Sequence, residues 1–286
     1  MRSPFSFWLV TTEHLENRLW FKDESDFKYA MNLVAVLSVN FPGRIISFVL
    51  MSNHVHFVLQ CTREQAREFV NRFKGMYSRY CTLKYGETEM LRNNKVDIKE
   101  LSLDDESLER AVAYVQMNPP AANICLEPSG YPWGTGGTFF NLNKPAYTKA
   151  GSLSARALRR LTHSRLPVPG NYLIDGRGFI VPDSYVPTDY VEKVFGTPSR
   201  MQYFLRTSSK ARRLKEGPSF KDQLVAEGLK NLCISLFQVT DFSRMEDSGK
   251  SEVLRQLRYR FSSDPNQLAR VSGLQYKEVC RLLELL

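Results

Sequence analysis

Two apolar runs separated by a two-residue turn constrain the fold of this chain more than any other feature. Residues 44–51 read RIISFVLM and residues 54–60 read HVHFVLQ, with Ser52 and Asn53 between them. Runs of this length that are rich in β-branched and aromatic residues are typical of strands, and a polar pair such as Ser-Asn suits a tight turn. The sequence therefore predicts a β-hairpin at residues 44–60.

The second strand of this hairpin begins with two histidines. His54 and His56 are two of only four histidines in the chain. Because successive side chains of a strand point to opposite faces, both imidazoles lie on one face, and Val55 and Phe57 lie on the other. The two histidines are either polar residues on a solvated face or two converging ligands for a metal ion. The strand alone leaves both interpretations open.

The segments around the hairpin predict an α+β fold. Residues 5–12 have the pattern of a strand, and residues 25–40 have that of a helix that ends at Phe41-Pro42-Gly43. A further helix is expected from Thr62, a suitable N-cap, to Tyr85, with Gly86 as its stop. Residues 103–117 predict another helix, opened by a capping box of Ser102 and Asp105 and ended at Pro119-Pro120. These elements suggest an antiparallel sheet with helices packed on it.

The helix expected at residues 62–85 has a basic exposed side. Arginines and lysines on that side suit a phosphate backbone, and we take Arg72, Lys74 and Arg79 as candidate DNA contacts. The helix also carries tyrosines that either stack on bases or belong to the core: Tyr77, Tyr80 and Tyr85.

The helix expected at residues 103–117 ends in a second group of chemically useful side chains. Tyr114 and Asn118 are four residues apart, and at 3.6 residues per turn they are neighbours on one side of the helix. The tyrosine borders the apolar stripe and could project toward the sheet that carries the histidines. Two imidazoles and one amide oxygen make a three-ligand site for a divalent ion such as Mg²⁺ or Mn²⁺.

Three motifs in this order resemble a known family. MSNHVHFVL at residues 51–59, YVQMNP at residues 114–119 and YPW at residues 131–133 are similar to the signature of single-tyrosine HUH transposases, most closely the REP-associated tyrosine transposases. The resemblance covers about residues 5–140, close to half of the chain. It implies a ferredoxin-like antiparallel sheet with packed helices, of the HUH endonuclease type.

The resemblance also implies roles for individual residues. His54, His56 and Asn118 would be metal ligands, and Tyr114 would be the nucleophile that forms a 5′-phosphotyrosine intermediate. The implied activity is cleavage and rejoining of single-stranded or hairpin DNA with Mg²⁺ or Mn²⁺.

Two segments depart from the family pattern. Residues 86–101 are mixed in charge where members of the family carry a basic segment with aromatic residues, and residues 118–124 read NPPAANI instead of Asn-Pro-Val-Arg-Ala-Gly. Two alternatives therefore stay open. One is a domesticated DNA-binding regulator with an inactive catalytic centre, and the other is a metal phosphodiesterase that activates water and uses Tyr114 only structurally.

The second half of the chain predicts a different organisation. We expect a transposase domain at residues 1–140, a basic and partly helical connecting region at 141–250, and a helix-turn-helix at 251–286. In the last segment a small residue, Ala269, precedes Gly273 by four positions, as at the tight turn of a helix-turn-helix. A three-helix packing module without DNA contacts is the alternative. If the module binds DNA, its second helix offers these contacts: Gln275, Tyr276, Lys277 and Arg281.

Composition narrows the partners and the compartment. The formal net charge is +9, with a sequence pI of about 9.3, which favours polyanionic partners. Nucleic acid is the first candidate, and a solvated basic face is the alternative. The five cysteines are scattered and never form C-x-x-C, so neither a disulfide framework nor a structural zinc site is expected. No run approaches the roughly 20 apolar residues of a membrane helix. We expect a cytoplasmic protein, either a monomer or a homodimer.

Overall fold

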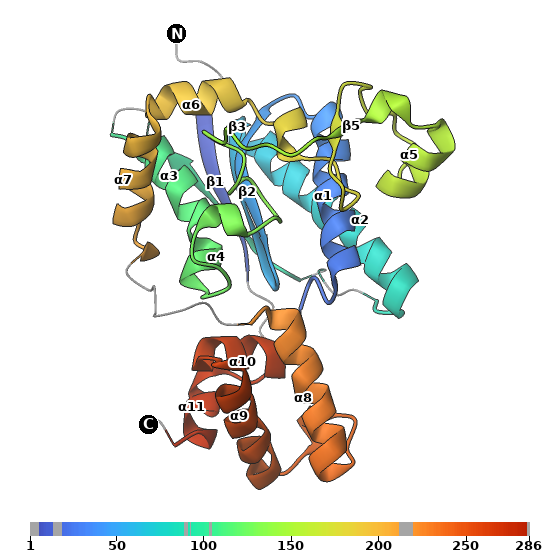
Figure 1. The fold of residues 1–286 in the computed structure, drawn as a ribbon, viewed down its shortest axis with the longest axis vertical. Coiled ribbons are helices and arrows are strands. Elements are labelled where there is room, and N and C mark those ends of the chain that lie inside the picture. Colours follow the sequence, from blue (N-terminus) through green and yellow to red (C-terminus); the bar gives the residue numbers. More distant parts are fainter. Residues whose placement is uncertain are drawn as a thin grey trace.

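The centre of the molecule is a four-stranded antiparallel sheet. The computed structural model describes residues 6–13, 19–88, 91, 93–102, 105–211 and 220–284. The chain runs through β1 (Ser6–Thr12), α1 (Glu24–Val39), β2 (Arg44–Met51), β3 (His54–Cys61), α2 (Arg63–Tyr85) and β4 (Val96–Leu101). The strand order is β2-β3-β1-β4. A βαββαβ chain with this order has the ferredoxin-like topology, which confirms the predicted fold class (Figure 1).

The predicted hairpin is confirmed residue by residue. Met51 pairs with His54 across the Ser52-Asn53 turn, and the pairing continues to Arg44 and Gln60. Thr62 caps α2 through a capping box, and α2 ends at Gly86 in the left-handed conformation with φ of 70°. β4 was not among the predicted elements. Its alternation of Val96 and Ile98 with charged residues is short, but it is the signal that could have revealed a strand at the edge of the sheet.

The two faces of the sheet have different partners. Phe57 points to the face covered by α2, where its ring contacts those of Phe69 and Phe73. His56 points to the opposite face and meets α3 (Ser107–Gln116). The alternation expected from the sequence therefore separates a hydrophobic layer from the layer that carries the histidines.

The start of α3 differs from the prediction. Residues 103 and 104 lie outside the described residues, and the helix begins at Ser107. Glu106 occupies the N-cap with φ of 60° and makes no side-chain capping bond, so the expected capping box of Ser102 and Asp105 is wrong. After α3, the Pro119-Pro120 pair lies within a short helix, α4 (Asn118–Ala121), because proline is tolerated in the first turn of a helix.

The open edge of β2 is covered by residues 131–135. The N–H of Leu50 donates to the carbonyl of Trp133 at 2.9 Å, and the hydroxyl of Tyr131 donates to the carbonyl of Leu50 at 2.7 Å. A Cβ on Gly134 would lie 2.5 Å from the carbonyl oxygen of Phe48. This position therefore requires glycine, and the Tyr-Pro-Trp motif closes a strand edge that would otherwise be exposed.

Residues 141–211 pack onto the sheet and its first helix. This region includes a short basic helix, α5 (Ala155–Thr162), which follows β5 (Thr148–Lys149) and precedes β6 (Leu173–Ile174). The helices α6 (Thr188–Phe195) and α7 (Pro198–Thr207) bury Phe195 and Phe204 in the main core. α7 lies beside α3 (Figure 1).

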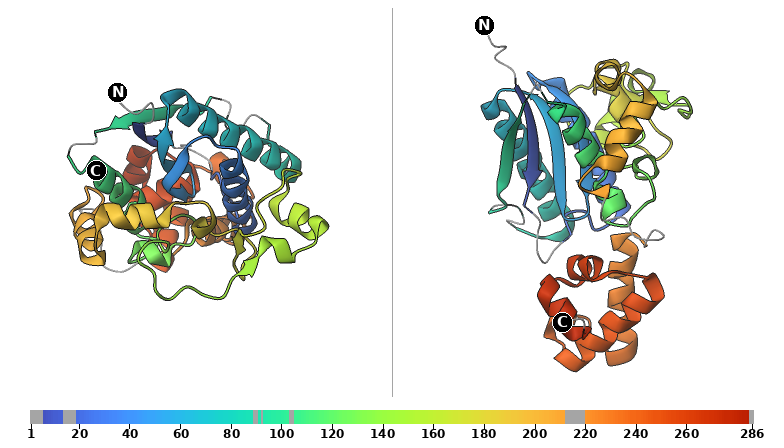
Figure 2. Two further views of the ribbon diagram at one scale, coloured as in Figure 1. Left: turned by 90° about the horizontal axis from the view of Figure 1, so that it is seen from above. Right: turned by 90° about the vertical axis from the view of Figure 1, so that its left-hand side faces the viewer.

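The C-terminal helices form a second core. They are α8 (Asp222–Phe237), α9 (Asp247–Phe261), α10 (Pro265–Ser272) and α11 (Tyr276–Leu282). Val225, Leu257 and Val279 are fully buried within this group. The core thus joins residues on both sides of the predicted boundary at residue 251. Figure 2 shows the group as a separate helical unit at one end of the sheet. In the described part of the chain, no helix is long and apolar enough to cross a membrane.

Candidate active site beside the β2–β3 hairpin

The two histidines lie together on the buried end of β3. The exposed fractions of His54 and His56 are 4% and 1%, and their ring centroids are 4.7 Å apart with nearly perpendicular planes. A solvated polar face, the alternative left open by the sequence, does not describe these residues. Two imidazoles at this separation are close enough to bind a single ion.

Hydrogen bonds orient both rings through Nδ1. The Nδ1 of His54 lies 2.8 Å from Oδ1 of Asn53, which places the proton on that nitrogen and makes Nε2 the atom of this ring that could bind a metal. The Nδ1 of His56 lies 2.9 Å from Oγ1 of Thr11, the residue opposite it on β1. The neighbouring strand and the hairpin turn therefore fix both imidazoles before any ligand binds.

Tyr114 lies beside this pair. The ring of Tyr114 is perpendicular to that of His56, with centroids 5.6 Å apart. The tyrosine is partly buried and lines a groove, so it is neither sealed in the core nor remote from the histidines. Residues separated by 58 positions in the sequence are thus brought together by the packing of α3 on β3.

Asn118 is held at the end of α3. It is 4% exposed, and its Nδ2 donates to the carbonyl of Tyr114 at 2.8 Å and to that of Val115 at 3.3 Å. Because the amide nitrogen is used by the helix end, the amide oxygen is the atom that could coordinate a cation.

The donor set fits a divalent ion with a mixed nitrogen and oxygen preference. Within the described ranges, no cluster of three or more histidine, cysteine or acidic residues is arranged to hold a metal. If the two imidazoles bind an ion, Asn118 is the residue that the sequence singled out as the source of an amide oxygen. Such a set leaves coordination positions for water or phosphate, as a catalytic site requires.

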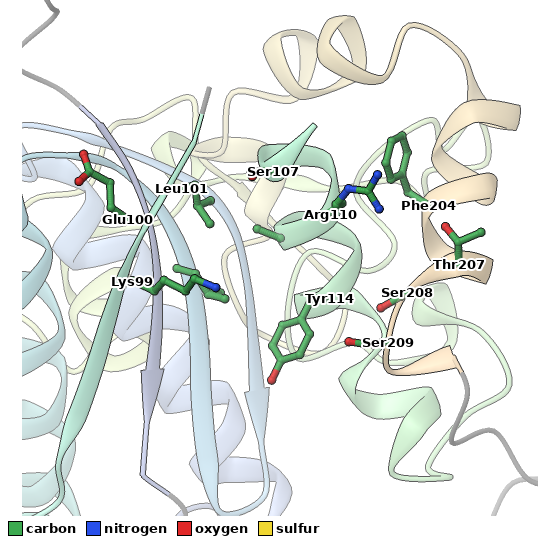
Figure 3. Close-up of a pocket in the computed structure, with 12 residues that line it drawn as sticks. Lys99, Glu100, Leu101, Ser107, Arg110, Tyr114, Phe204, Thr207, Ser208 and Ser209 are labelled. Carbon is green, nitrogen blue, oxygen red and sulfur yellow. The ribbon is translucent and has the colours of Figure 1, made fainter. Parts of the chain in front are cut away.

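A groove of about 510 Å³ leads to Tyr114. β4 contributes Lys99 to one side, α3 contributes Arg110 and Tyr114, and the end of α7 contributes Ser208 and Ser209. Figure 3 shows Lys99 extending from β4 toward α3, with the two serines on the side of the groove where Tyr114 lies. Cations and hydroxyl groups around a tyrosine are suited to binding a phosphodiester chain.

Comparisons with known proteins agree with this geometry. Residues 12–116 match the model of a protein family described as Transposase IS200 like. This part of the chain is similar to IS200-like transposases. The predicted resemblance to single-tyrosine transposases is confirmed at this level, and a role in DNA processing follows from it.

A solved structure of a REP-associated tyrosine transposase bound to a REP hairpin also matches. It is 16% identical in sequence, and the match covers 46% of this chain and 76% of the other, with a TM-score of 0.36. No curated protein matches the chain. The family match, and not this structural likeness, supports the resemblance to transposases.

Lys210 is a site residue that sequence reasoning missed. Its Nζ lies 4.8 Å from the centroid of the Tyr114 ring. It comes from the segment after α7, beyond the residues that match the transposase family. In the sequence it is one of several cations in the basic stretch RTSSKARRLK at residues 206–215, and nothing local indicates which of them contacts Tyr114.

The tyrosines of α2 have structural contacts. Tyr77 is fully buried, and the hydroxyls of Tyr80 and Tyr85 donate to the buried carboxylate of Asp26. Of the two interpretations left open by the sequence, the core one therefore holds.

The predicted DNA contacts on α2 differ in exposure. Arg72 and Arg79 are exposed. Lys74 is 7% exposed and its ammonium donates to the carbonyl of Asn94, and its burial lowers the pKa of its amine. We therefore correct the prediction for Lys74, which packs inside the domain.

The predicted contacts in the C-terminal helices lie at the surface. Gln275, Tyr276 and Lys277 are exposed at the start of α11. Arg281 is exposed as well and forms an ion pair of 2.8 Å with Asp247. All four could reach a ligand from the unit's surface.

Proposed function

We propose that this protein cleaves and rejoins single-stranded DNA beside a hairpin, as a REP-associated type of single-tyrosine transposase, with Tyr114 as the nucleophile. The observation that carries the proposal is the contact between the rings of Tyr114 and His56, with His54 directly beside them. A phenol next to two oriented imidazoles at the edge of a groove lined by Lys99 and Arg110 has the parts needed for attack on phosphorus.

The covalent step exchanges one phosphodiester bond for another. The phenolic oxygen of Tyr114 forms a bond to phosphorus, the bond from phosphorus to the 3′ oxygen breaks, and the phenolic proton is lost while the 3′ oxygen gains one. The product is a 5′-phosphotyrosine and a free 3′-hydroxyl, so the bond energy is kept for rejoining to another end.

His54, His56 and Asn118 would hold Mg²⁺ or Mn²⁺. When bound, the ion supplies charge neutralisation at the scissile phosphate. Asn53 and Thr11 contact Nδ1 of the two imidazoles, so Nε2 would be the metal-binding atom of each ring. These contacts lower the reorganisation needed on binding.

Lys210 supports activation of the nucleophile. A tyrosine hydroxyl with an ordinary pKa near 10 is mostly protonated at neutral pH. The ammonium of Lys210 lies 4.8 Å from the centroid of the Tyr114 ring, and a positive charge beside the nucleophile would stabilise the negative charge that develops during the attack. This residue is our candidate for the assisting group that the sequence left unnamed.

The groove beside Tyr114 would hold the strand that is cut. Lys99 is exposed at its wall, and Arg110 is held over the ring of Phe204 and by an ion pair of 3.1 Å with Glu106. We assign Lys99 to a phosphate next to the scissile one. Lys99→Ala should weaken binding of a single strand several-fold, whereas Lys95→Ala, an exposed lysine outside the groove, should not.

The C-terminal helices would add recognition of the hairpin stem. α10 and α11 are joined across Gly273, which has φ of 82°, and the second helix presents Gln275, Tyr276, Lys277 and Arg281. This arrangement supports a helix-turn-helix whose second helix enters the major groove. Arg72 and Arg79 on α2 would contact phosphates.

A pool of hairpin oligonucleotides with randomised single-stranded flanks tests the proposal. Incubation with Mg²⁺ or Mn²⁺ should yield a covalent protein–DNA adduct that is absent from Tyr114→Phe and retained in Tyr203→Phe, an exposed tyrosine on α7. Binding without cleavage by the wild-type protein would instead indicate a DNA-binding regulator. Cleavage that survives Tyr114→Phe would indicate a phosphodiesterase that uses water.

A further inference from the structure

A buried carboxylate joins the C-terminal helices to the hairpin that carries the histidines. Asp222, the first residue of α8, is 1% exposed. Arg270 of α10 donates to both of its oxygens, from Nε at 3.0 Å and from Nη2 at 3.1 Å, and Gln267 donates at 2.9 Å. The hydroxyl of Ser52, in the β2–β3 turn, donates to the same carboxylate. Asp222 therefore binds both parts of the molecule at once.

The charge of Asp222 is maintained in this buried position. Burial alone would raise the pKa of the carboxyl, but the Arg270 guanidinium and the hydrogen bonds from Arg270, Ser52 and Gln267 outweigh it, so that the pKa is lowered. The N-terminus of α8 also favours a negative charge. A buried carboxylate that keeps its charge requires all its donors, which makes the position of Ser52 part of the same network.

The turn is held from a second direction as well. The carbonyl of Ser52 accepts hydrogen bonds from the N–H groups of Trp20 at 2.7 Å and Phe21 at 3.2 Å. Gln223, the next residue of α8, donates to the carbonyl of Phe21 at 3.1 Å. The first turn of α8 thus contacts Ser52 itself and the segment of Trp20 and Phe21 that holds it. Figure 1 shows the start of α8 at the end of the sheet where the β2–β3 turn lies.

Ser52 is followed directly by the residues that orient a candidate metal ligand. Asn53 accepts the hydrogen bond from Nδ1 of His54, and Ser52 and Asn53 together are the turn. A shift of the Ser52 backbone would therefore move the Asn53 amide and rotate the imidazole of His54. The network runs without a gap from Arg270 through Asp222 to that imidazole.

From this continuity we infer that Asp222 is a positioning residue for His54, acting through Ser52, and that the C-terminal helical unit is a required part of the metal-binding site. The inference rests on the proposed function in so far as His54 is taken as a ligand. Asp222 and Arg270 lie beyond residues 12–116, so this support is supplied by a part of the chain that the transposase family model does not include.

Three variants of the full-length protein test the inference. Ser52→Ala removes the link to the turn and leaves the ion pair of Asp222 with Arg270. Asp222→Asn keeps the shape of the side chain but removes its charge. Asp247→Asn is the matched control, because it breaks an exposed ion pair with Arg281 in the same helical unit. If Asp222→Asn does not fold, Ser52→Ala alone decides.

The first measurement is the NMR spectrum of the imidazole nitrogens without metal. We expect the His54 resonances to change in Ser52→Ala and Asp222→Asn, as the proton moves off Nδ1 or exchanges between the nitrogens, and to stay unchanged in Asp247→Asn. Unchanged His54 resonances in Ser52→Ala overturn the inference, whatever the DNA assay gives.

The second measurement is Mn²⁺ affinity, with covalent adduct formation as a function of Mn²⁺ concentration. We expect about tenfold weaker Mn²⁺ binding in the two test variants, since disturbing the hydrogen bond from His54 to Asn53 should have an effect at the low end of that seen when an outer partner of a metal ligand is lost. Adduct yield should recover at saturating Mn²⁺. A wild-type protein that forms an adduct, with test variants that bind Mn²⁺ as the wild type does, overturns the inference and leaves the proposed function intact. Absence of any adduct from the wild type overturns the proposed function, and the His54 resonances still decide the coupling.

Discussion

The sheet that carries the candidate site and the C-terminal helices are stabilised by different kinds of contact. β1 pairs with β3 from Ser6 and Cys61 onward, so the sheet depends on residues far apart in the sequence. In the C-terminal unit, α8 packs on α9 and α10, and α10 packs on α11, which are near neighbours along the chain. Long-range pairing can bring a tyrosine and two histidines from separate motifs to one place. Local helix packing instead provides a compact unit whose surface is free to serve recognition.

The largest expected difference between the two regions concerns chemistry. His56→Ala should lower adduct formation by about a thousandfold, because loss of a ligand removes several kcal/mol of stabilisation at the scissile phosphate. Affinity for a hairpin should change little, since lysine and arginine contacts to phosphates dominate binding. Single-turnover cleavage and fluorescence anisotropy measure the two effects. Equal loss of binding and cleavage would contradict the separation of catalysis from DNA binding.

The second comparison concerns stability. Phe57→Ala removes a fully buried ring of the sheet core and should cost about 3–5 kcal/mol of unfolding free energy, whereas Leu257→Ala in the C-terminal core should cost about 2–5 kcal/mol. Because the two cores are separate, each variant should lower the protection of backbone amides against hydrogen exchange mainly in its own region. Hydrogen exchange resolved by peptide measures this. Uniform loss of protection in both variants would show that the regions unfold together.

A smaller effect is expected where the two regions meet. The pKa of Asp222 is lowered in the folded protein, because its hydrogen bonds and Arg270 outweigh the effect of burial. A carboxyl of this kind stabilises the fold above its unfolded pKa of about 4, and this contribution is lost as the pH falls through the lower folded value. The stability advantage of the wild type over Asp222→Asn should therefore be full at neutral pH and shrink below about pH 4. Denaturant titrations from neutral to acidic pH would detect this, and a constant difference would argue against a charged Asp222.

The smallest effect is expected on the surface of the helical unit. Lys277→Ala should lower hairpin affinity modestly and reduce the slope of log affinity against log salt by about one, as expected for one lost phosphate contact. Lys230→Ala, an exposed lysine on α8, is the control. Titrations at several salt concentrations measure both. The same slope for wild type and Lys277→Ala would place the DNA on another face of the unit.

Local patterns determined much of this protein from its sequence alone. The hairpin and its Ser52-Asn53 turn, the capping box at Thr62 and the stop at Gly86 follow from short-range periodicity and backbone preferences. The placement of His54 with His56, and of Tyr114 with Asn118, followed in the same way. Alternate residues of a strand share a face, and residues one helical turn apart are neighbours. The short strand β4 was missed because an exposed edge strand has little hydrophobic alternation to reveal it.

Only the tertiary structure decided which of these local pieces meet. The contact of Tyr114 with His56, the return of Lys210 to the Tyr114 ring and the burial of Lys74 depend on packing between distant segments. The link from Asp222 to Ser52 spans 170 residues. Periodicity tells which face of an element is apolar, but burial and hydrogen bonding across the whole chain select the partner of that face. For this reason the sequence indicated the candidate residues of the site, whereas the tertiary structure was needed to find the residues that contact and position them.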